Sequence, residues 1–379
     1  MIKLSGSVVN GPASSFMGVI SSMYDMAEIV RGRYVLLCED GNKSSTTGFA
    51  GVLSSKPVTE SHSVQLQDWC NYLTDGDVVY YDGEHKRIIV LYRVKGNANS
   101  FLVTEQCSSN CLMCSQPPKA ANDEHLYDLA IRTVDFLSRE TATAIGITGG
   151  EPFVNSSKFL TLLQRINNRL PDTSVHVLTN GRMFAYPSLV RDVANVNHKD
   201  VMFGIPLYSS VATTHDFVVQ ATGAFDQTIR GILNAKRAGL KVEIRVVLHK
   251  QTIPELRLLA QFIARNLPMV DHVALMGLEH QGHVKMNQDA LYIDPMTYQS
   301  ELAAAVNELK YAGPRVSIYN LQLCILDPSI RKFAVKSISD WKNDYLPVCS
   351  SCEAKSECGG FFTWNLPFKS AGIHPLQMA

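Results

Sequence analysis

The sequence predicts an α/β protein whose middle part is an open or partial (β/α)6 barrel. Short apolar runs alternate with stretches of helical spacing over residues 99–315, which is typical of a parallel sheet covered by helices. Six such units are too few to close the usual barrel of eight strands. A strand-rich zone precedes this part and a cysteine-rich zone follows it. We therefore expect a β-rich domain at residues 1–98, the barrel at 99–315 and a C-terminal extension at 316–379.

The first zone is predicted to be a small β domain. Cys38 and Cys70 lack the spacing of metal ligands, so we assign both to packing. No function follows from the residues of this zone. Its β-branched and aromatic runs are Tyr34–Cys38, Asp77–Tyr81 and Arg87–Arg93, with a hairpin turn at Asp82-Gly83 between the last two.

Strands and helices are expected to alternate through the barrel. Gly239 stands where a helix C-terminal stop belongs, and a last helix at about Pro295–Tyr311 precedes the C-terminal extension. The expected strands are Phe101–Thr104, Ala144–Thr148, Val175–Leu178, Val201–Pro206, Val242–Leu248 and His272–Met276. The expected helices between them are Glu124–Arg139, Lys158–Arg169, Pro187–Ala194, Asp226–Ala238 and Pro254–Arg265.

Length, charge and composition exclude several classes of protein. A chain of 379 residues with 46% hydrophobic residues can bury a full-sized core, so it is not a disordered tail. Because 35 basic residues balance 35 acidic ones, we expect no nucleic-acid partner. No apolar run reaches the length of a membrane span, and no export signal is evident. The nine cysteines are an odd number, which favours reduced thiols and a cytoplasmic location.

Three cysteines directly follow the first predicted strand. Cys107, Cys111 and Cys114 lie at its C-terminal end, where parallel α/β sheets bind ligands. Three thiolates on one loop can hold three irons of a [4Fe–4S] cluster, and because the next cysteine is Cys324, the fourth iron would lack a local protein ligand. The alternative is a structural zinc site or chance clustering. Zinc sites generally add a second pair of Cys or His, and no such pair follows nearby.

This Cys-x3-Cys-x2-Cys arrangement resembles that of the radical S-adenosylmethionine (SAM) superfamily, which carries it after the first strand of a partial barrel. The resemblance continues at Gly149-Gly150-Glu151-Pro152, where the family has a glycine-rich loop that contacts the SAM amino group. Glycines allow a close approach of backbone to ligand, and the Glu151 carboxylate can accept hydrogen bonds from an ammonium. The resemblance therefore implies a [4Fe–4S] cluster on the three cysteines, with SAM bound beside it.

Three further positions match SAM contacts of the family. Asn180 ends the third strand, Arg245 lies on the fifth, and Gly277 ends the sixth. Each position also has an ordinary alternative. Asn180 can belong to a helix-entry turn, Arg245 can pair with Glu243 or be exposed, and Gly277 can serve packing.

Two positions depart from the family pattern. Met113 replaces the usual aromatic residue before the third cysteine, and as a bulky apolar side chain it can keep the packing role. Pro206 falls where relatives often have a ribose-binding serine. Because a proline side chain cannot hydrogen-bond a ribose, we assign no ribose contact.

A second group of four cysteines lies near the C-terminus. Cys324, Cys349, Cys352 and Cys358 are enough to close a metal site, and a zinc ribbon is one interpretation. Their Cys-x2-Cys-x5-Cys part resembles the SPASM and twitch domains of peptide-modifying radical SAM enzymes, which hold auxiliary [4Fe–4S] clusters. The fuller SPASM form has another cysteine where this chain has Phe362. The resemblance therefore implies one auxiliary [4Fe–4S] cluster.

Three segments narrow the resemblance to the C-type radical SAM maturase of the His-Xaa-Ser system. They are Gln116-Pro117-Pro118, the stretch from Lys336 through Trp341 to Lys342, and Cys358-Gly-Gly-Phe-Phe362. The partners that this implies are a peptide with His-Xaa-Ser repeats, a second radical SAM maturase, and an electron donor such as flavodoxin or ferredoxin. The sequence does not reveal which modification is installed.

The resulting hypothesis is a radical SAM peptide maturase. Reductive cleavage of SAM gives a 5′-deoxyadenosyl radical that abstracts hydrogen from the peptide, and the protein orients the cofactor. One alternative is a radical SAM enzyme that acts on a small molecule or RNA, and another is a non-catalytic Fe–S or zinc scaffold. We name no catalytic acid, base or hydrogen donor. His215-Asp216 can touch substrate, but a local hydrogen-bonding pair is the simpler interpretation.

Overall fold

The computed structural model describes residues 2–4, 8–38, 46–56, 62–66, 73–96, 98–336 and 343–377, so Cys70 and Trp341 lie outside the described residues. The chain forms two compact units. The first comprises Met1–Leu102, Glu124–Gly146 and Thr161–Ser174, and the second comprises Val103–Asp123, Ile147–Leu160 and Val175–Ala379. The three domain boundaries expected from the sequence remain predictions, and the second unit contains both cysteine groups.

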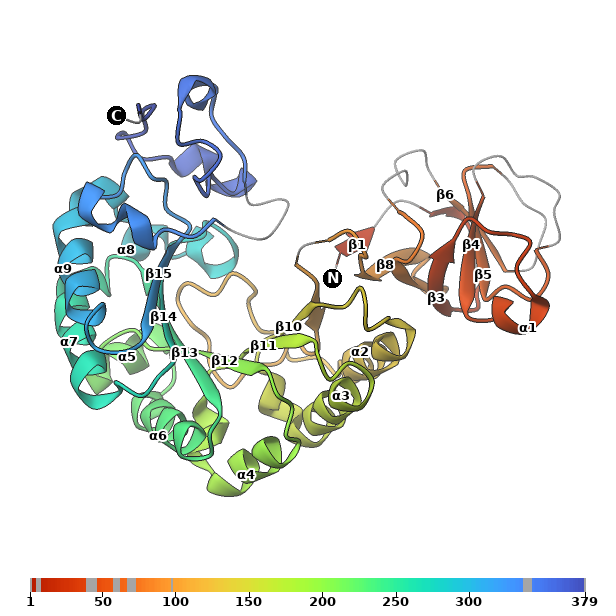
Figure 1. Cartoon of the computed structure of the whole chain (residues 1–379), viewed down its shortest axis with the longest axis horizontal. Coiled ribbons are helices and arrows are strands. Elements are labelled where there is room, and N and C mark those ends of the chain that lie inside the picture. Colours follow the sequence, from red (N-terminus) through yellow and green to blue (C-terminus); the bar gives the residue numbers. More distant parts are fainter. Residues whose placement is uncertain are drawn as a thin grey trace. The chain divides into compact units, whose positions relative to one another are not determined.

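The first unit contains an eight-stranded sheet in the order β1-β8-β7-β3-β4-β5-β6-β2 (Figure 1). Its core includes Val35, Leu53 and Tyr81, all fully buried. The expected hairpin is present, with Asp82 paired to Arg87 across its turn. The strands are β1 (Ile2–Leu4), β2 (Val8–Asn10), β3 (Phe16–Ser21), β4 (Tyr34–Cys38), β5 (Gly51–Ser54), β6 (Ser63–Leu66), β7 (Val78–Asp82) and β8 (Arg87–Tyr92), with the short helix α1 (Glu28–Arg31) before β4.

The second sheet has seven strands in the order β15-β14-β13-β12-β11-β10-β9, and the strands from β11 to β15 run parallel. This confirms the α/β class with a curled parallel sheet. The six expected strands are all present, and the sheet has one more, because β15 pairs with β14. The strands are β9 (Ser100–Leu102), β10 (Ala144–Thr148), β11 (Ser174–Leu178), β12 (Val201–Pro206), β13 (Lys241–Leu248), β14 (His272–Gly277) and β15 (Arg315–Tyr319).

Helices connect these strands, and Figure 1 shows α6, α7 and α9 along one side of β13 to β15. The helix α5, which follows β12 and contains His215 and Asp216, was not among the expected helices. None of the helices in the described ranges has the length and apolar character needed to span a bilayer. The helices are α2 (His125–Phe136), α3 (Ser156–Arg169), α4 (Pro187–Asn195), α5 (Ala212–Val219), α6 (Ala224–Arg237), α7 (Leu256–Asn266), α8 (Gln288–Leu291) and α9 (Gln299–Leu309).

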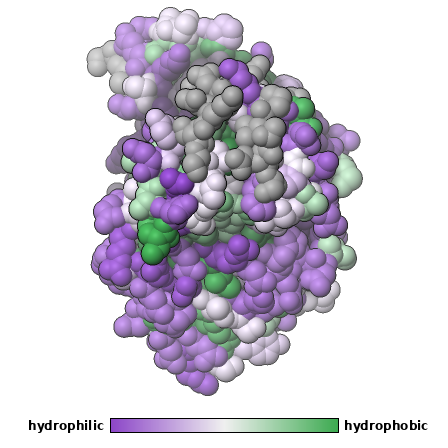
Figure 2. All heavy atoms as spheres, turned by 90° about the vertical axis from the view of Figure 1, so that its right-hand side faces the viewer, coloured by the Kyte–Doolittle hydropathy of each residue, from purple (hydrophilic) through white to green (hydrophobic). Residues whose placement is uncertain are grey.

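Four buried aromatic rings support the strand ends of the second unit. Phe153 lies 4.2 Å from Phe159 and 4.8 Å from Phe184, measured between ring centroids, and Phe184 lies 5.0 Å from Phe203. Such pairs each add about 0.5–1.5 kcal/mol beyond the burial of their area. They fix the backbone that follows β10, β11 and β12. On the face seen in Figure 2, by contrast, polar residues predominate and hydrophobic ones form small separate areas.

Candidate cofactor site

A cavity of about 260 Å³ lies at the C-terminal ends of strands β10 to β14. Its walls come from segments far apart in the sequence, which the parallel sheet brings to one edge. Glu151 and Pro152, although expected in the site, do not line it. The expected residues that do line it are Cys107, Cys111, Cys114, Gly149, Gly150, Asn180, Arg245 and Gly277.

Backbone hydrogen bonds hold residues 107–114, the cysteine loop, in place. The amides of Asn110 and Leu112 donate to the carbonyls of Val219 and Val218 at the end of α5, over 3.1 and 3.0 Å. Met113 is 7% exposed and packs in an apolar cluster with Val218, which agrees with the packing role expected for it. The loop is therefore preorganised by its neighbours in the fold.

Burial raises the pKa of all three thiols. The pKa of Cys107 rises to about 11 and that of Cys111 to about 12, and the pKa of Cys114 is also raised. Besides burial, the charges of the neighbouring thiolates contribute at Cys107 and Cys111. A thiolate is therefore costly here unless a cation accompanies it, and iron bound to sulfur supplies that positive charge.

The cavity beside the three cysteines has room for a group larger than one ion. In the parts of the chain that the structure describes, no three His, Cys, Asp or Glu side chains are grouped so that they could hold a single metal ion. A tetrahedral zinc site needs sulfur atoms converging at about 2.3 Å from one centre. Three thiols around a cavity instead fit a larger group, such as the [4Fe–4S] cluster.

The two glycines after β10 allow the cysteine loop to pack closely. A Cβ atom on Gly150 would lie 2.1 Å from the carbonyl oxygen of Gln106 and 3.0 Å from the Cβ of Cys107, and one on Gly149 would lie 2.5 Å from the Thr104 oxygen. In return, the amides of Gly150 and Glu151 donate to the carbonyls of Thr104 and Gln106 over 2.9 and 2.7 Å. The glycines thus position Cys107 as well as lining the cavity.

Gly150→Ala is expected to displace Cys107 and to lower the iron bound at the first cysteine group at least severalfold. The obstructing atoms are backbone, which cannot move aside cheaply, and overpacking costs about 1–3 kcal/mol. Iron analysis and melting temperature after anaerobic reconstitution provide the test. Gly32→Ala is the matched control, because the nearest atom to a Cβ there is 3.8 Å away. Wild-type iron content in Gly150→Ala would contradict this role.

Glu151 is buried and accepts hydrogen bonds from two neighbouring loops. The side chain is 1% exposed, and its carboxylate accepts from the Phe153 amide at 2.9 Å, the Thr179 hydroxyl at 2.7 Å and the Asn180 amide at 2.6 Å. Burial raises the pKa of Glu151, while these hydrogen bonds oppose the rise. The carboxylate therefore joins the loops after β10 and β11, and its contact with a ligand's ammonium stays a prediction.

Arg245 reaches the cavity from β13 and is fixed by a buried carboxylate. Its Nη1 donates to Glu243 Oε1 at 2.7 Å, and His272 Nδ1 lies 2.7 Å from Glu243 Oε2. Burial alone would raise the pKa of Glu243, but hydrogen bonds from His176 and His272 and the Arg245 charge hold it well below its usual range. Arg245 thus pairs with Glu243 and also lines the cavity. The ion pair and a contact with SAM are therefore compatible interpretations of this residue.

Residues 101–263 match the family model described as the Radical SAM superfamily. The chain therefore contains a radical SAM domain. The match begins in β9, and it includes Cys107, Cys111, Cys114 and the loop after β10. This superfamily implies a [4Fe–4S] cluster and SAM as cofactors.

Several solved structures resemble the chain at low identity. Streptococcus suis SuiB bound to the precursor peptide SuiA is 16% identical, with a TM-score of 0.45 over 59% of this chain and 50% of that one. The anSMEcpe structure with AdoMet and the Cp18Cys peptide is 16% identical, with a TM-score of 0.44 over 58% and 62%. Escherichia coli coproporphyrinogen III oxidase (HemN), a radical SAM enzyme, is 12% identical, with a TM-score of 0.44 over 56% and 52%. The chain spans about half the length of the SuiB chains. No curated protein sequence matches it.

The second cysteine group lies after the radical SAM domain, around a smaller cavity. All four of its cysteines, Cys324, Cys349, Cys352 and Cys358, line that cavity. The Leu376 amide donates to the Cys352 sulfur at 3.3 Å, and the Gly360 amide donates to the Cys358 sulfur at 3.5 Å. Hydrogen bonds to sulfur stabilise thiolate ligands and tune clusters. The C-terminal tail thus contributes directly to this group.

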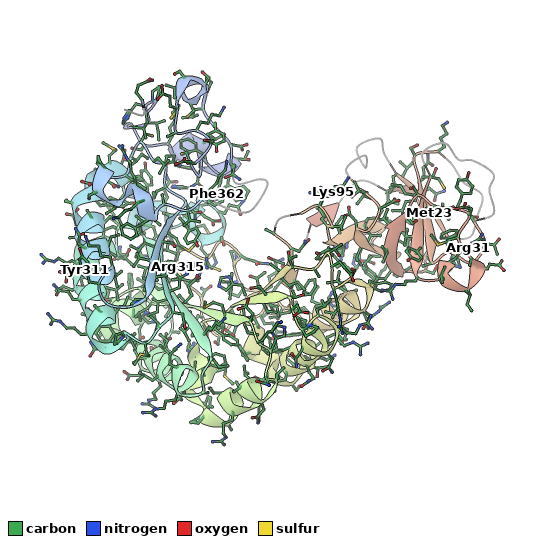
Figure 3. All side chains as sticks on the ribbon, in the orientation of Figure 1. Met23, Arg31, Lys95, Tyr311, Arg315 and Phe362 are labelled. Carbon is green, nitrogen blue, oxygen red and sulfur yellow. The ribbon has the colours of Figure 1, made fainter. Side chains whose placement is uncertain are left out.

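Phe362 fills the position at which the fuller SPASM form has a cysteine. Phe362 is labelled in Figure 3. Its ring is 3% exposed and stacks on Trp364 with a centroid distance of 5.3 Å and an interplanar angle of 7°. Packing rather than ligation therefore accounts for this residue. The second cavity is therefore lined by four cysteines, and Phe362 is not among its lining residues.

One asparagine connects the C-terminal segment to the wall of the first cavity. Asn365 accepts from the His280 amide at 2.8 Å and donates to the Leu278 carbonyl at 3.0 Å. The His280 ring stacks on Phe368 at 4.0 Å. Asn365 thus contacts Leu278, which lines the first cavity, and Phe361, four residues before Asn365, lines the second.

Sequence reasoning missed Tyr208 and Arg182. Tyr208 lines the cavity two residues after Pro206, and its amide donates to His215 Nδ1 at 3.2 Å. Burial lowers the pKa of His215 to about 4, so it acts as a neutral acceptor. Asp216 accepts from the Phe225 amide at 2.8 Å, so the side chains of His215 and Asp216 each accept a hydrogen bond from nearby backbone. No motif signals Tyr208, because only the fold brings it beside the cysteine loop.

Proposed function

We propose that this protein is a radical SAM enzyme that modifies a ribosomally made peptide with His-Xaa-Ser repeats. The observation that carries the proposal is the gathering of Cys107, Cys111 and Cys114 with the Gly149-Gly150 loop around one cavity of the radical SAM domain. The resemblance of the flanking segments to the His-Xaa-Ser maturase supports the peptide class. A second radical SAM maturase and a flavodoxin or ferredoxin complete the proposed system.

The three cysteines would hold three irons of a [4Fe–4S] cluster and leave the fourth for SAM. When bound, the cluster and SAM supply the one-electron chemistry that generates a carbon-centred radical. The Arg245 guanidinium would pair with the SAM carboxylate, and backbone at Gly149 and Gly150 would face its amino group. Asn180 and Gly277 line the remaining wall, while Tyr208 and Leu278 help to keep water from the reacting atoms.

The four C-terminal cysteines would hold one auxiliary [4Fe–4S] cluster. Four thiols provide every iron with a protein ligand, which is the arrangement of an electron-transfer or structural cluster rather than a SAM site. A zinc ribbon on the same four cysteines is the alternative, and metal analysis of the purified protein distinguishes the two. The auxiliary cluster would accept an electron from the substrate radical or stabilise the fold of the C-terminal extension.

Mass spectrometry of a co-expressed His-Xaa-Ser peptide tests the substrate. We expect a discrete mass change with the wild-type protein and none with the Cys107→Ala variant, which lacks one proposed cluster ligand. Cys38→Ala serves as the control, since that thiol belongs to neither group. An unchanged peptide in cells that also contain the second maturase would contradict the proposed substrate, while leaving SAM chemistry to be measured separately.

Glu151→Ala is expected to weaken SAM binding about tenfold or more while most of the iron is retained. Removing the carboxylate leaves the buried Phe153 and Asn180 amides unpaired, which costs about 1–3 kcal/mol for each group. Asn180 then loses its fixed position in the cavity wall. Anaerobic titration calorimetry with SAM and iron analysis measure the two effects. Glu84→Ala, at an exposed turn, is the control, and wild-type affinity in Glu151→Ala would refute the role.

A further inference from the structure

Arg182, in the segment after β11, donates hydrogen bonds to the loop that carries Cys107, Cys111 and Cys114. Its Nη1 donates to the Ser108 carbonyl at 2.6 Å and to the Ser109 hydroxyl at 3.2 Å. Its Nε donates to Gln227 Oε1 on α6 at 2.6 Å. Ser108 and Ser109 stand between Cys107 and Cys111, so the guanidinium is held against the loop that carries the proposed cluster ligands.

Neighbouring contacts make this attachment rigid. Asn180 Nδ2 donates to the Ser108 hydroxyl at 3.0 Å, and Asn180 Oδ1 accepts from the Arg182 amide at 3.0 Å. The Ser109 amide in turn donates to the Cys107 sulfur at 3.4 Å. The chain of contacts therefore runs from Arg182 through Ser109 to a proposed ligand sulfur.

The charge of Arg182 lies against the loop that carries the proposed cluster ligands. Its three acceptors are a carbonyl, a hydroxyl and an amide oxygen, which fix the guanidinium without neutralising it. The same charge opposes the raised pKa of Glu151, the buried carboxylate nearby. A fixed cation thus stabilises negative charge in this part of the cavity.

We propose that Arg182 is a positioning and redox-tuning residue, which raises the reduction potential of the three-cysteine cluster through its fixed positive charge. The inference rests on the proposed function, since it assumes that Cys107, Cys111 and Cys114 hold the cluster. On reduction the cluster takes one electron from an external one-electron donor, and no bond forms or breaks. The reduced cluster carries one more negative charge, so a nearby cation favours it.

Arg182→Gln and Gln227→Glu test the charge by two routes. The first removes the cation, and the second places an anion beside it while leaving an acceptor for Nε. Both should shift the midpoint potential of the three-cysteine cluster to more negative values in an anaerobic titration followed by electron paramagnetic resonance. The signal is assigned by its loss in Cys107→Ala. Arg182→Lys keeps the charge and should restore most of the potential.

Arg191→Gln is the matched control, because it removes the same charge from an exposed position on α4 and should leave the potential unchanged. A wild-type potential in Gln227→Glu, or in an Arg182→Gln variant that keeps its iron, would overturn the inference. An equal shift in Arg182→Lys and Arg182→Gln would also overturn it, since geometry rather than charge would then be responsible. If the wild-type protein assembles no cluster on these cysteines, the proposed function fails as well, and iron analysis reveals this before any titration.

Discussion

Replacing Cys107, Cys111 and Cys114 together by alanine is expected to abolish SAM cleavage and to reduce the iron content from about eight to about four per chain. The cavity has no other described cysteine in its wall that could take over. The remaining four irons belong to the C-terminal group, which lies around its own cavity. Iron and sulfide analysis, together with chromatographic measurement of 5′-deoxyadenosine, gives both values from one preparation.

The matched control is Cys38→Ala, which removes a partly buried thiol from the first unit and should change neither value. Retention of about eight irons in the triple variant would show that other ligands hold the first cluster. Zinc at one per chain with half the expected iron in the wild-type protein would instead identify the C-terminal group as a ribbon.

Cys352→Ala is expected to abolish peptide modification while SAM cleavage in the absence of peptide continues. The Cys352 sulfur accepts from the Leu376 amide, so its loss removes both a cluster ligand and the contact that keeps the C-terminal tail over the second cavity. The first cavity keeps its own three cysteines and its glycine loop. The rate of 5′-deoxyadenosine formation and the yield of modified peptide, measured in the same preparation, show whether SAM cleavage continues without peptide modification.

Either of two results would overturn this assignment. Peptide modification at the wild-type rate would make the auxiliary cluster dispensable. Loss of SAM cleavage in folded Cys352→Ala would mean that the two sites are more tightly coupled than their separate ligand groups suggest. The Asn365 contacts to Leu278 and His280 are the route for such coupling, so Asn365→Ala would then be expected to give the same loss.

The alternation of strands and helices was predictable because it depends on local apolar patterns. The strand Val201–Pro206 and the helix Pro187–Asn195 match the expectation closely, since their apolar spacing and proline start are local signals. The strand Arg315–Tyr319 was missed, because a short run at a supposed domain boundary carries no sign that it joins the preceding sheet. The helix Ala212–Val219 was missed because its β-branched residues are poor helix formers.

The candidate site was predictable where residue spacing reflects chemistry and unpredictable where partners come from other segments. The spacing of Cys107, Cys111 and Cys114 predicts a cluster by itself, and the structure adds that they share a cavity with Gly149. The role of Glu151 depends on Thr179 and Asn180, which meet it only through the sheet. No periodicity or motif encodes such tertiary contacts.

Transfer of deuterium tests the central claim most directly. A His-Xaa-Ser peptide with deuterium on carbon is incubated anaerobically with reconstituted wild-type protein, SAM and a reductant, and the 5′-deoxyadenosine formed is analysed by mass spectrometry. We expect 5′-deoxyadenosine that carries one deuterium from the peptide, because the radical generated in the cavity takes a hydrogen atom from a carbon of the substrate. Modified peptide accompanied by 5′-deoxyadenosine without deuterium, or by none, would contradict the account.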